Sequence, residues 1–213
     1  MLKTNIKASQ ISNLTDARYF AAWGTEWLGF CFDFGQDHYI AHQEVKAIKE
    51  WIVGPKIVGE FGAGQTIQEV QKYIDLLGLD LVQVGPFADL DFIQQLSVPV
   101  IKAYYLEDTK HLSELAKPML LLQNDVEYSI LDFTKNNISW TAIQADEEAL
   151  ENLKQLCSHN LIMLHINMKD ADEMEDIRTS LRIHGFSLQG GEEEKVGYKS
   201  FDELDDLFEA LEP

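Results

Sequence analysis

The segment KIVGEFGAGQTIQEVQKYIDLLGLDLVQV, residues 56–84, contains one strand–helix–strand unit and decides the fold class. Its two ends, 56–61 and 79–84, are apolar on consecutive positions, which is typical of strands buried on both faces of a parallel sheet. Between them a stripe of apolar residues recurs at helical spacing: Ile67, Val70, Ile74 and Leu77. Gly78 follows as a helix terminator. The unit predicts an α/β protein.

The same alternation continues along the whole chain. Eight apolar segments are predicted to be strands: 5–9, 27–32, 56–61, 79–84, 98–104, 119–123, 161–166 and 186–189. Two more, 130–133 and 138–143, are alternative strands, so the assignment within 124–145 stays open. No linker-like composition interrupts residues 1–213, and 46% hydrophobic residues suffice for one core. We therefore expect a single-domain (β/α)₈ barrel, favoured over a doubly wound sheet because no G-x-G-x-x-G follows the first strand.

The charge of the chain limits its partners. It has 36 acidic and 17 basic residues, a formal net charge of −19 and a pI near 4.5. Such a surface repels phosphate backbones and anionic lipid, so we expect no nucleic-acid and no membrane partner. The acidic clusters lack the spacing of metal loops, and Cys31 and Cys157 are too far apart for a disulfide framework. We expect no metal, no cofactor and a cytoplasmic protein.

Both ends of the chain resemble phosphoribosylanthranilate isomerase. K-A-S-Q-I-S-N-L-T-D-A (7–17) is similar to that family's opening, in which Lys, an apolar residue, Cys, Gly, Ile and Thr precede Asp-Ala. The segment 185–200 is similar to its last strand and phosphate loop. Landmarks between them keep the family's order: 28–32, 38–40, 58–61, 82–85 and 100–103. The resemblance implies a TIM barrel with its site at the carboxyl ends of the strands.

The family's reaction is an Amadori rearrangement of an aminoaldose phosphate in tryptophan biosynthesis, and it needs a base and an acid. The resemblance places Ser9 where the family has its catalytic cysteine, and a hydroxyl is a far weaker base. It places Leu122 or Gln123 where the family has the aspartate that acts as the general acid. Asp125 is the nearest carboxylate if the register slips, and Asp132 is a more remote substitute. Ser9 and Asp125 are therefore the catalytic candidates.

The expected binding residues are also altered. His38 stands for the family's arginine after strand 2, whereas Gln83 and Lys102 match the pattern. Ile166 and Asn167 replace a Gly-Gly pair, so we expect weak phosphate binding. The strand-end residues expected to line the site are His38, Gln83, Lys102, His165, Gln189, Gly190 and Gly191. Their ligand would be a small molecule, phosphorylated or not.

Three functions remain compatible with these residues. The first is an isomerase in which His165 or His38 polarises Ser9. The second is a non-catalytic barrel that binds a small molecule or a protein, and the third is a barrel enzyme acting on a different ligand. The replaced residues favour the second and third functions. They predict a divergent paralogue in which the family's standard mechanism is lost. The oligomeric state stays open.

Overall fold

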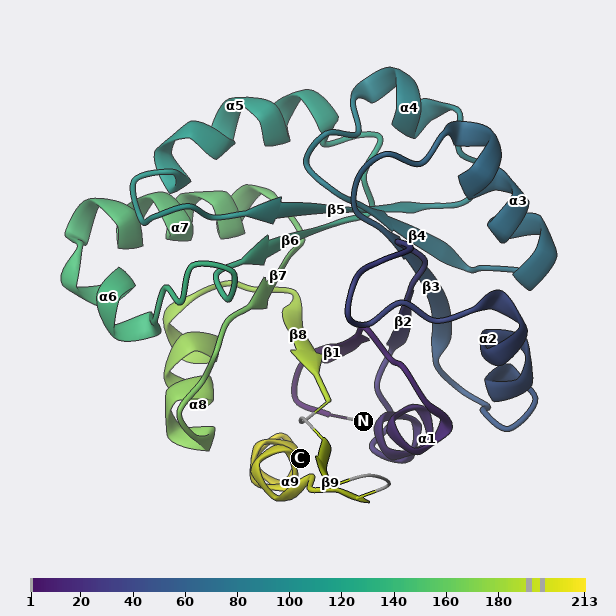
Figure 1. Cartoon of the computed structure of the whole chain (residues 1–213). Coiled ribbons are helices and arrows are strands. Elements are labelled where there is room, and N and C mark those ends of the chain that lie inside the picture. Colours follow the sequence, from purple (N-terminus) through teal and green to yellow (C-terminus); the bar gives the residue numbers. More distant parts are fainter. Residues whose placement is uncertain (1, 191–192, 196–197) are drawn as a thin grey trace.

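The computed structural model describes residues 2–190, 193–195 and 198–213. Eight parallel strands form a closed barrel in chain order, and β1 pairs with both β2 and β8 (Figure 1). The barrel strands are β1 (Asn5–Ser9), β2 (Trp27–Cys31), β3 (Lys56–Phe61), β4 (Leu81–Val84), β5 (Val100–Tyr105), β6 (Tyr128–Asp132), β7 (Ile162–His165) and β8 (Gly185–Gln189). The predicted (β/α)₈ barrel is confirmed.

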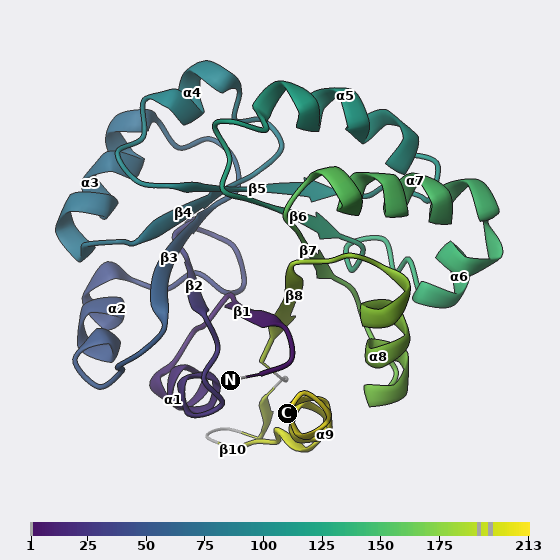
Figure 2. The ribbon, with the colours of Figure 1, turned by 180° about the vertical axis from the view of Figure 1, so that it is seen from behind.

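Helices surround the barrel on its outside, as both ribbon views show (Figures 1 and 2). They are α1 (Leu14–Ala22), α2 (His42–Lys49), α3 (Ile67–Leu77), α4 (Leu90–Gln94), α5 (Leu112–Leu122), α6 (Trp140–Ala145), α7 (Glu147–His159), α8 (Ala171–Ser180) and α9 (Asp202–Ala210). A two-stranded antiparallel hairpin, β9 (Glu193–Lys195) with β10 (Tyr198–Lys199), lies between β8 and α9. The N-terminal segment meets the end of the chain, where the Lys3 amide donates to the Leu211 carbonyl over 2.8 Å.

The helix boundaries follow local signals in the sequence. Thr66 and Glu69 form a capping box at the start of α3, and Gly78 ends it in the left-handed conformation with φ 55°. The Asn13 side chain accepts the Asp16 amide at the start of α1, and the Asp146 side chain accepts the Ala149 amide at the start of α7. These side chains satisfy N–H groups that the first helical turn leaves unpaired.

One predicted strand is wrong. The segment 119–123 lies mostly in α5, and β6 is formed by 128–132, which overlaps the alternative candidate 130–133. Leu115 and Met119 are buried on one face of α5, whereas Leu120 and Leu121 are exposed, so the apolar run has helical rather than two-sided burial. The second alternative, 138–143, is not a strand, because Ser139 caps α6 through the Ala142 amide.

Side chains alternate between the barrel interior and the helix layer. The interior apolar cluster takes Ile101 and Ala103 from β5, whereas their neighbours Val100 and Tyr104 pack in the outer cluster between strands and helices. Lys102 has the same parity as these outer residues. The alternation therefore decides which strand-end residues face the mouth. Among the described residues, no helix is long and apolar enough to cross a membrane.

Candidate active site at the barrel mouth

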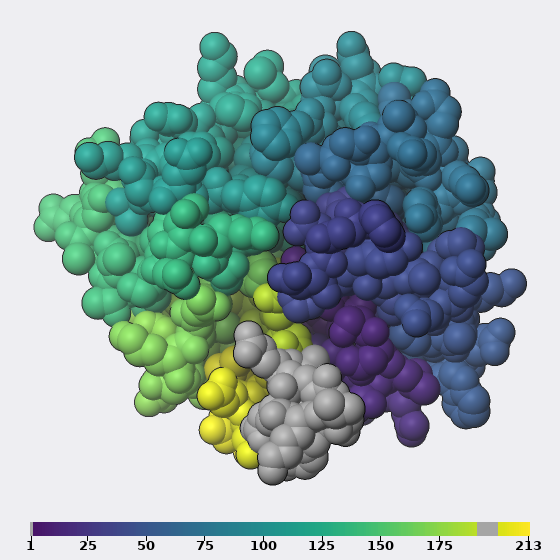
Figure 3. Space-filling view, viewed as in Figure 1, coloured from purple at the N-terminus to yellow at the C-terminus, as the bar shows by residue number. Residues whose placement is uncertain are grey.

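A pocket of about 520 Å³ opens at the carboxyl ends of the strands. Residues at or just after the end of every strand line it, from Gln10 after β1 to Gln189 at the end of β8. The space-filling view shows this face hollowed between the loop after β2 and the segment after β6 (Figure 3). This is where a (β/α)₈ barrel presents the side chains that bind and convert ligands.

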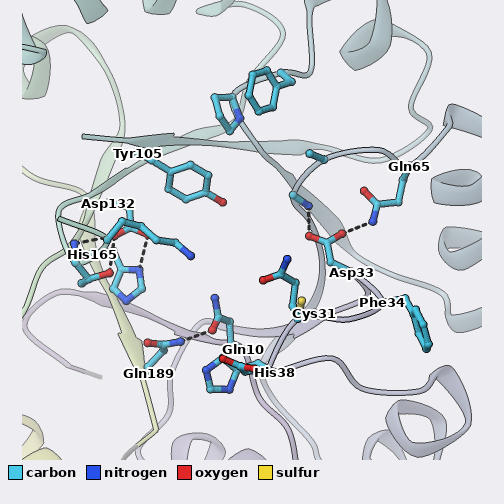
Figure 4. A pocket seen from close by; sticks show the side chains of 18 residues that line it. Gln10, Cys31, Asp33, Phe34, His38, Gln65, Tyr105, Asp132, His165 and Gln189 are labelled. Atoms are coloured by element: carbon cyan, nitrogen blue, oxygen red, sulfur yellow. Dashed lines mark hydrogen bonds and ion pairs between the residues drawn. The ribbon is translucent and has the colours of Figure 1, made fainter. Parts of the chain in front are cut away.

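Asp132 and His165 form the chemically most distinctive pair in the pocket. They end the neighbouring strands β6 and β7 and are register partners. His165 Nδ1 lies 3.5 Å from Asp132 Oδ2, and both side chains line the cavity (Figure 4). A carboxylate that holds one ring nitrogen orients the imidazole and stabilises its protonated form. The pair can therefore transfer protons to and from a bound ligand.

Asp132 is held in its charged form by its surroundings. Burial by itself raises the pKa of its carboxyl group, but hydrogen bonds and charge from His165, together with Thr134, lower the pKa on balance. The Thr134 amide and hydroxyl donate to Asp132 Oδ1 over 2.8 and 2.7 Å. Asp132 is thus suited to pair with His165 and poorly suited to donate a proton itself.

The lowered pKa has a consequence for acid stability. Ionised Asp132 stabilises the fold at pH values above its unfolded pKa of about 3.9, and this contribution disappears as the pH falls through the lower folded pKa. We expect Asp132→Asn to flatten the fall in unfolding free energy between about pH 5 and pH 2. Urea denaturation across this range measures the slope. Asp125→Asn is the control, and an Asp132→Asn slope equal to that of the native chain would contradict the expectation.

The wall opposite His165 contains a thiol and a second carboxylate. Cys31 ends β2, and burial raises the pKa of its thiol to about 11, so it is a neutral group near pH 7. Asp33 accepts the Gly62 amide over 2.6 Å and also the Gln65 side-chain amide. These contacts tie the loop after β2 to the loop after β3. Burial is the main reason that the pKa of Asp33 is raised.

Two residues add hydrogen-bond donors near Asp132. Tyr105 ends β5 and points into the cavity, and burial raises the pKa of its hydroxyl to about 12 (Figure 4). Lys135 follows β6 and places its ammonium 5.5 Å from the centre of the Tyr105 ring. A neutral phenol and an ammonium group are both able to polarise a ligand carbonyl oxygen.

Ser9 lies beneath the pocket rather than in its lining. It ends β1, is 4% exposed, and its hydroxyl is 2.7 Å from Lys7 Nζ and 2.6 Å from Ser187 Oγ. Lys7 forms a buried ion pair with Glu60 in the barrel interior. Ser9 is therefore part of an internal polar network and is not among the residues that line the cavity.

Lys102 and Gln83, expected to contact a ligand, are not among the residues that line the cavity. Lys102 donates to the carbonyls of Gly85, Pro86 and Ala88 over 2.7, 3.0 and 2.6 Å, so its ammonium organises the loop after β4. Burial lowers its pKa to about 8. Gln83 lies in β4, and its side-chain oxygen is buried without a hydrogen-bond partner among the described residues.

The remaining expected residues divide into three groups. His38, His165 and Gln189 line the pocket. Asp125 follows α5 and accepts a 2.9 Å hydrogen bond from Gln94, so the structure does not bring it into the pocket lining. Gly190 lies just beyond β8, outside the lining, and Gly191 lies outside the described residues.

The central carboxylate was not predicted from the sequence, because the sixth strand was expected at 119–123 instead of 128–132. Asp132, considered a remote substitute, occupies the end of β6, where the family resemblance requires an acidic aspartate. The statement that this position had become Leu122 or Gln123 is therefore corrected. The signal was present in I-L-D-F (130–133), an apolar run that ends in a carboxylate. Gln10, Cys31, Asp33, Tyr105 and Lys135 were also missed, and Cys31 and Tyr105 had comparable strand-end positions.

Two features near the mouth oppose anion binding. Ile166 follows β7 and is a buried core residue rather than an open glycine turn. The α8 N-terminus is occupied by the chain's own carboxylates: Asp170 accepts the Glu173 amide over 2.8 Å, and Glu173 accepts the Lys169 amide over 2.8 Å. A helix N-terminus binds anions through N–H groups that have no other acceptor, whereas these two amides already donate to carboxylates. Within the described residues no cluster of His, Cys, Asp and Glu has the arrangement of a metal site.

Several solved structures share the fold of this chain. Phosphoribosylanthranilate isomerase from Thermus thermophilus is 24% identical, with a TM-score of 0.75 over 97% of this chain and 98% of its own. The isomerase from Thermotoga maritima is 17% identical, with a TM-score of 0.78 over 98% of both chains. A third structure, the isomerase in complex with reduced 1-(o-carboxyphenylamino)-1-deoxyribulose 5-phosphate, is 17% identical, with a TM-score of 0.73 over 98% of both chains.

The chain therefore has the fold of phosphoribosylanthranilate isomerase over nearly its whole length. The resemblance stated from the sequence motifs is confirmed at this level. No protein-family model and no curated protein sequence matches the chain.

Proposed function

We propose that this protein is a divergent relative of phosphoribosylanthranilate isomerase that moves a proton within a small, sugar-like ligand at the barrel mouth. The observation that carries the proposal is the Asp132–His165 pair, which ends two adjacent strands and opens into the pocket. An imidazole held by a carboxylate is a common general acid–base arrangement. The class of ligand is suggested by the isomerase of the same fold that holds a deoxyribulose 5-phosphate derivative.

In the proposed reaction His165 takes the proton from C2 of an open-chain aldose. The electron pair of the broken C–H bond forms an enediol, and the carbonyl oxygen gains a proton from a neighbouring donor. Tyr105 and Lys135 supply such donors within the same pocket. His165 then returns its proton to C1, while the C2 hydroxyl of the enediol gives its proton back to the donor and becomes the carbonyl of the ketose. Asp132 keeps the imidazole oriented throughout and stabilises its charged form.

The tryptophan-pathway reaction itself is not the activity that we assign. Ser9 takes the place of the family's basic cysteine and lies beneath the pocket, bonded to Lys7 and Ser187. The phosphate-binding features are also changed, with core residue Ile166 after β7 and a hairpin between β8 and α9. These differences support a paralogue with another substrate. The end of β6 still provides a carboxylate, so the differences that separate this chain from the isomerases lie at the base and at the anion site.

Hydrogen exchange tests the proposed function without knowledge of the natural substrate. The protein is incubated with D-ribose or ribose 5-phosphate in D₂O, and loss of the C2 proton signal is followed by NMR. We expect faster exchange than in buffer for at least one of the sugars, with ketose appearing alongside. Protein that binds a sugar without exchanging its C2 proton would favour the non-catalytic alternative and overturn the proposal.

Inorganic phosphate is expected to bind weakly, with a dissociation constant of about 1 mM or higher at moderate ionic strength. The physical reason is that the Asp170 and Glu173 carboxylates already accept the Glu173 and Lys169 amides at the start of α8, where their charge repels an anion. Isothermal titration calorimetry gives the measurement. Asp170→Ser keeps a capping hydroxyl and removes one charge, so it should strengthen binding modestly. Micromolar affinity in the native chain would show that another anion site exists.

A further inference from the structure

Gln10 has a backbone conformation that its side chain does not favour. Its φ is 55°, and among the described non-glycine residues only Asn137 also has a positive φ. Asparagine is well tolerated in the left-handed region, whereas glutamine gains no such local stabilisation. Gln10 directly follows β1 and lines the pocket. A strained residue at such a place persists only where its surroundings hold it.

The surrounding atoms that hold Gln10 come from the barrel interior. Glu60 Oε2 accepts the Gln10 amide over 3.1 Å, and Glu60 Oε1 is paired with Lys7 Nζ. The Lys7 and Glu60 side chains are 0% and 5% exposed. Gly29 leaves room for them, because a Cβ there would overlap the Glu60 carboxylate and lie 2.7 Å from Lys7 Nζ. A buried ion pair therefore fixes the backbone of a pocket residue.

The side chain of Gln10 meets a second amide on the pocket wall. Gln189 Nε2 donates to Gln10 Oε1, and both residues lie at the joined ends of β1 and β8 (Figure 4). Each amide has a further group, Gln10 Nε2 and Gln189 Oε1, without a hydrogen-bond partner among the described residues. One donor beside one acceptor is complementary to hydroxyl groups, which both donate and accept.

We infer that Gln10 and Gln189 form a specificity-determining amide pair that binds hydroxyl groups of a neutral polyol portion of the ligand. Glycine at position 10 would adopt the same backbone without strain. The strained conformation therefore indicates that the glutamine side chain itself is needed at this position. Lys7 and Glu60 act through Gln10 and are positioning residues. The inference deepens the proposed function, and it rests on that function in one respect: both assume that the ligand binds in the pocket at the barrel mouth.

The amide pair is tested by measuring stability and sugar binding on the same variants. Gln10→Gly removes one amide and relieves the positive φ, so we expect an unchanged or higher Tm together with about tenfold weaker binding of D-ribose. Gln189→Leu should weaken ribose binding by a similar factor. NMR titration with D-ribose gives the affinities, and thermal unfolding gives Tm.

Asn137→Gly is the matched control, because it changes the other positive-φ residue, which is not among the residues that line the pocket. It should leave ribose affinity unchanged. Unaltered ribose affinity in Gln10→Gly, or no saturable ribose binding by the native chain, would overturn the inference. So would a Tm several degrees lower in Gln10→Gly with no effect of Gln189→Leu, since this identifies a purely structural contact.

The two proposals fail in different ways. Amide-dependent ribose binding without C2 exchange would support the amide pair and reject proton transfer. Exchange that depends on His165 but not on Gln10 or Gln189 would support proton transfer and reject the amide pair.

Discussion

Replacing His165 with glutamine is expected to slow C2 hydrogen exchange by about 10²- to 10⁴-fold, the range typical of a lost general base. Glutamine keeps a polar side chain at the end of β7 but does not accept a proton near neutral pH. The rate is measured by NMR under saturating sugar, so that weaker binding does not hide the effect. Sugar affinity should change far less than the rate.

The companion variant Asp132→Asn separates orientation from proton transfer. An asparagine amide neither stabilises the imidazolium nor fixes the same ring tautomer, so the rate should fall although His165 remains. His159→Gln is the control, since His159 is an exposed residue at the end of α7. Retention of more than a tenth of the native rate in His165→Gln would exclude His165 as the base.

Lys7→Met is expected to lower the unfolding free energy by about 3–5 kcal/mol, because it leaves Glu60 charged and unpaired inside the barrel. Ser9 also loses the donor that contacts it over 2.7 Å. Urea denaturation measures the loss. The double variant Lys7→Met with Glu60→Met should recover most of the stability, since apolar residues of similar volume often replace a buried ion pair without cost.

The double variant also separates packing from positioning. It removes the Glu60 oxygen that accepts the Gln10 amide over 3.1 Å. The double variant should therefore bind ribose more weakly than the native chain does, although its stability is restored. Equal stability in Lys7→Met and the native chain would show that the ion pair contributes little to the fold.

The fold was predictable because its strands and helices carry different periodicities. Segment 56–84 combines two largely buried strands with a stripe of apolar residues at helical spacing, and the structure forms β3, α3 and β4 there. The run M-L-L-L-Q (119–123) was not decidable in this way. A short apolar run fits a buried strand and a helix equally well, and only packing shows that Met119 is buried while Leu120 is exposed.

The site was predictable only in part, because two of its determinants are not visible in the order of the residues along the chain. The first is side-chain parity: both faces of a barrel strand are apolar, so the sequence does not show that Lys102 points to the helix layer while Ile101 points inward. The second is the path of the loops. Asp33 enters the pocket wall through its bonds to Gly62 and Gln65, residues that the sequence separates widely.

Closure of the barrel has a consequence for how the chain is made. β1 emerges first from the ribosome, yet its hydrogen bonds to β8 depend on residues 185–189 near the other end. Until these are synthesised, the nascent sheet has two unpaired edges, at β1 and at the newest strand, and such edges favour association with other chains. Pairing of β8 with β1 is therefore the step that removes both edges at once.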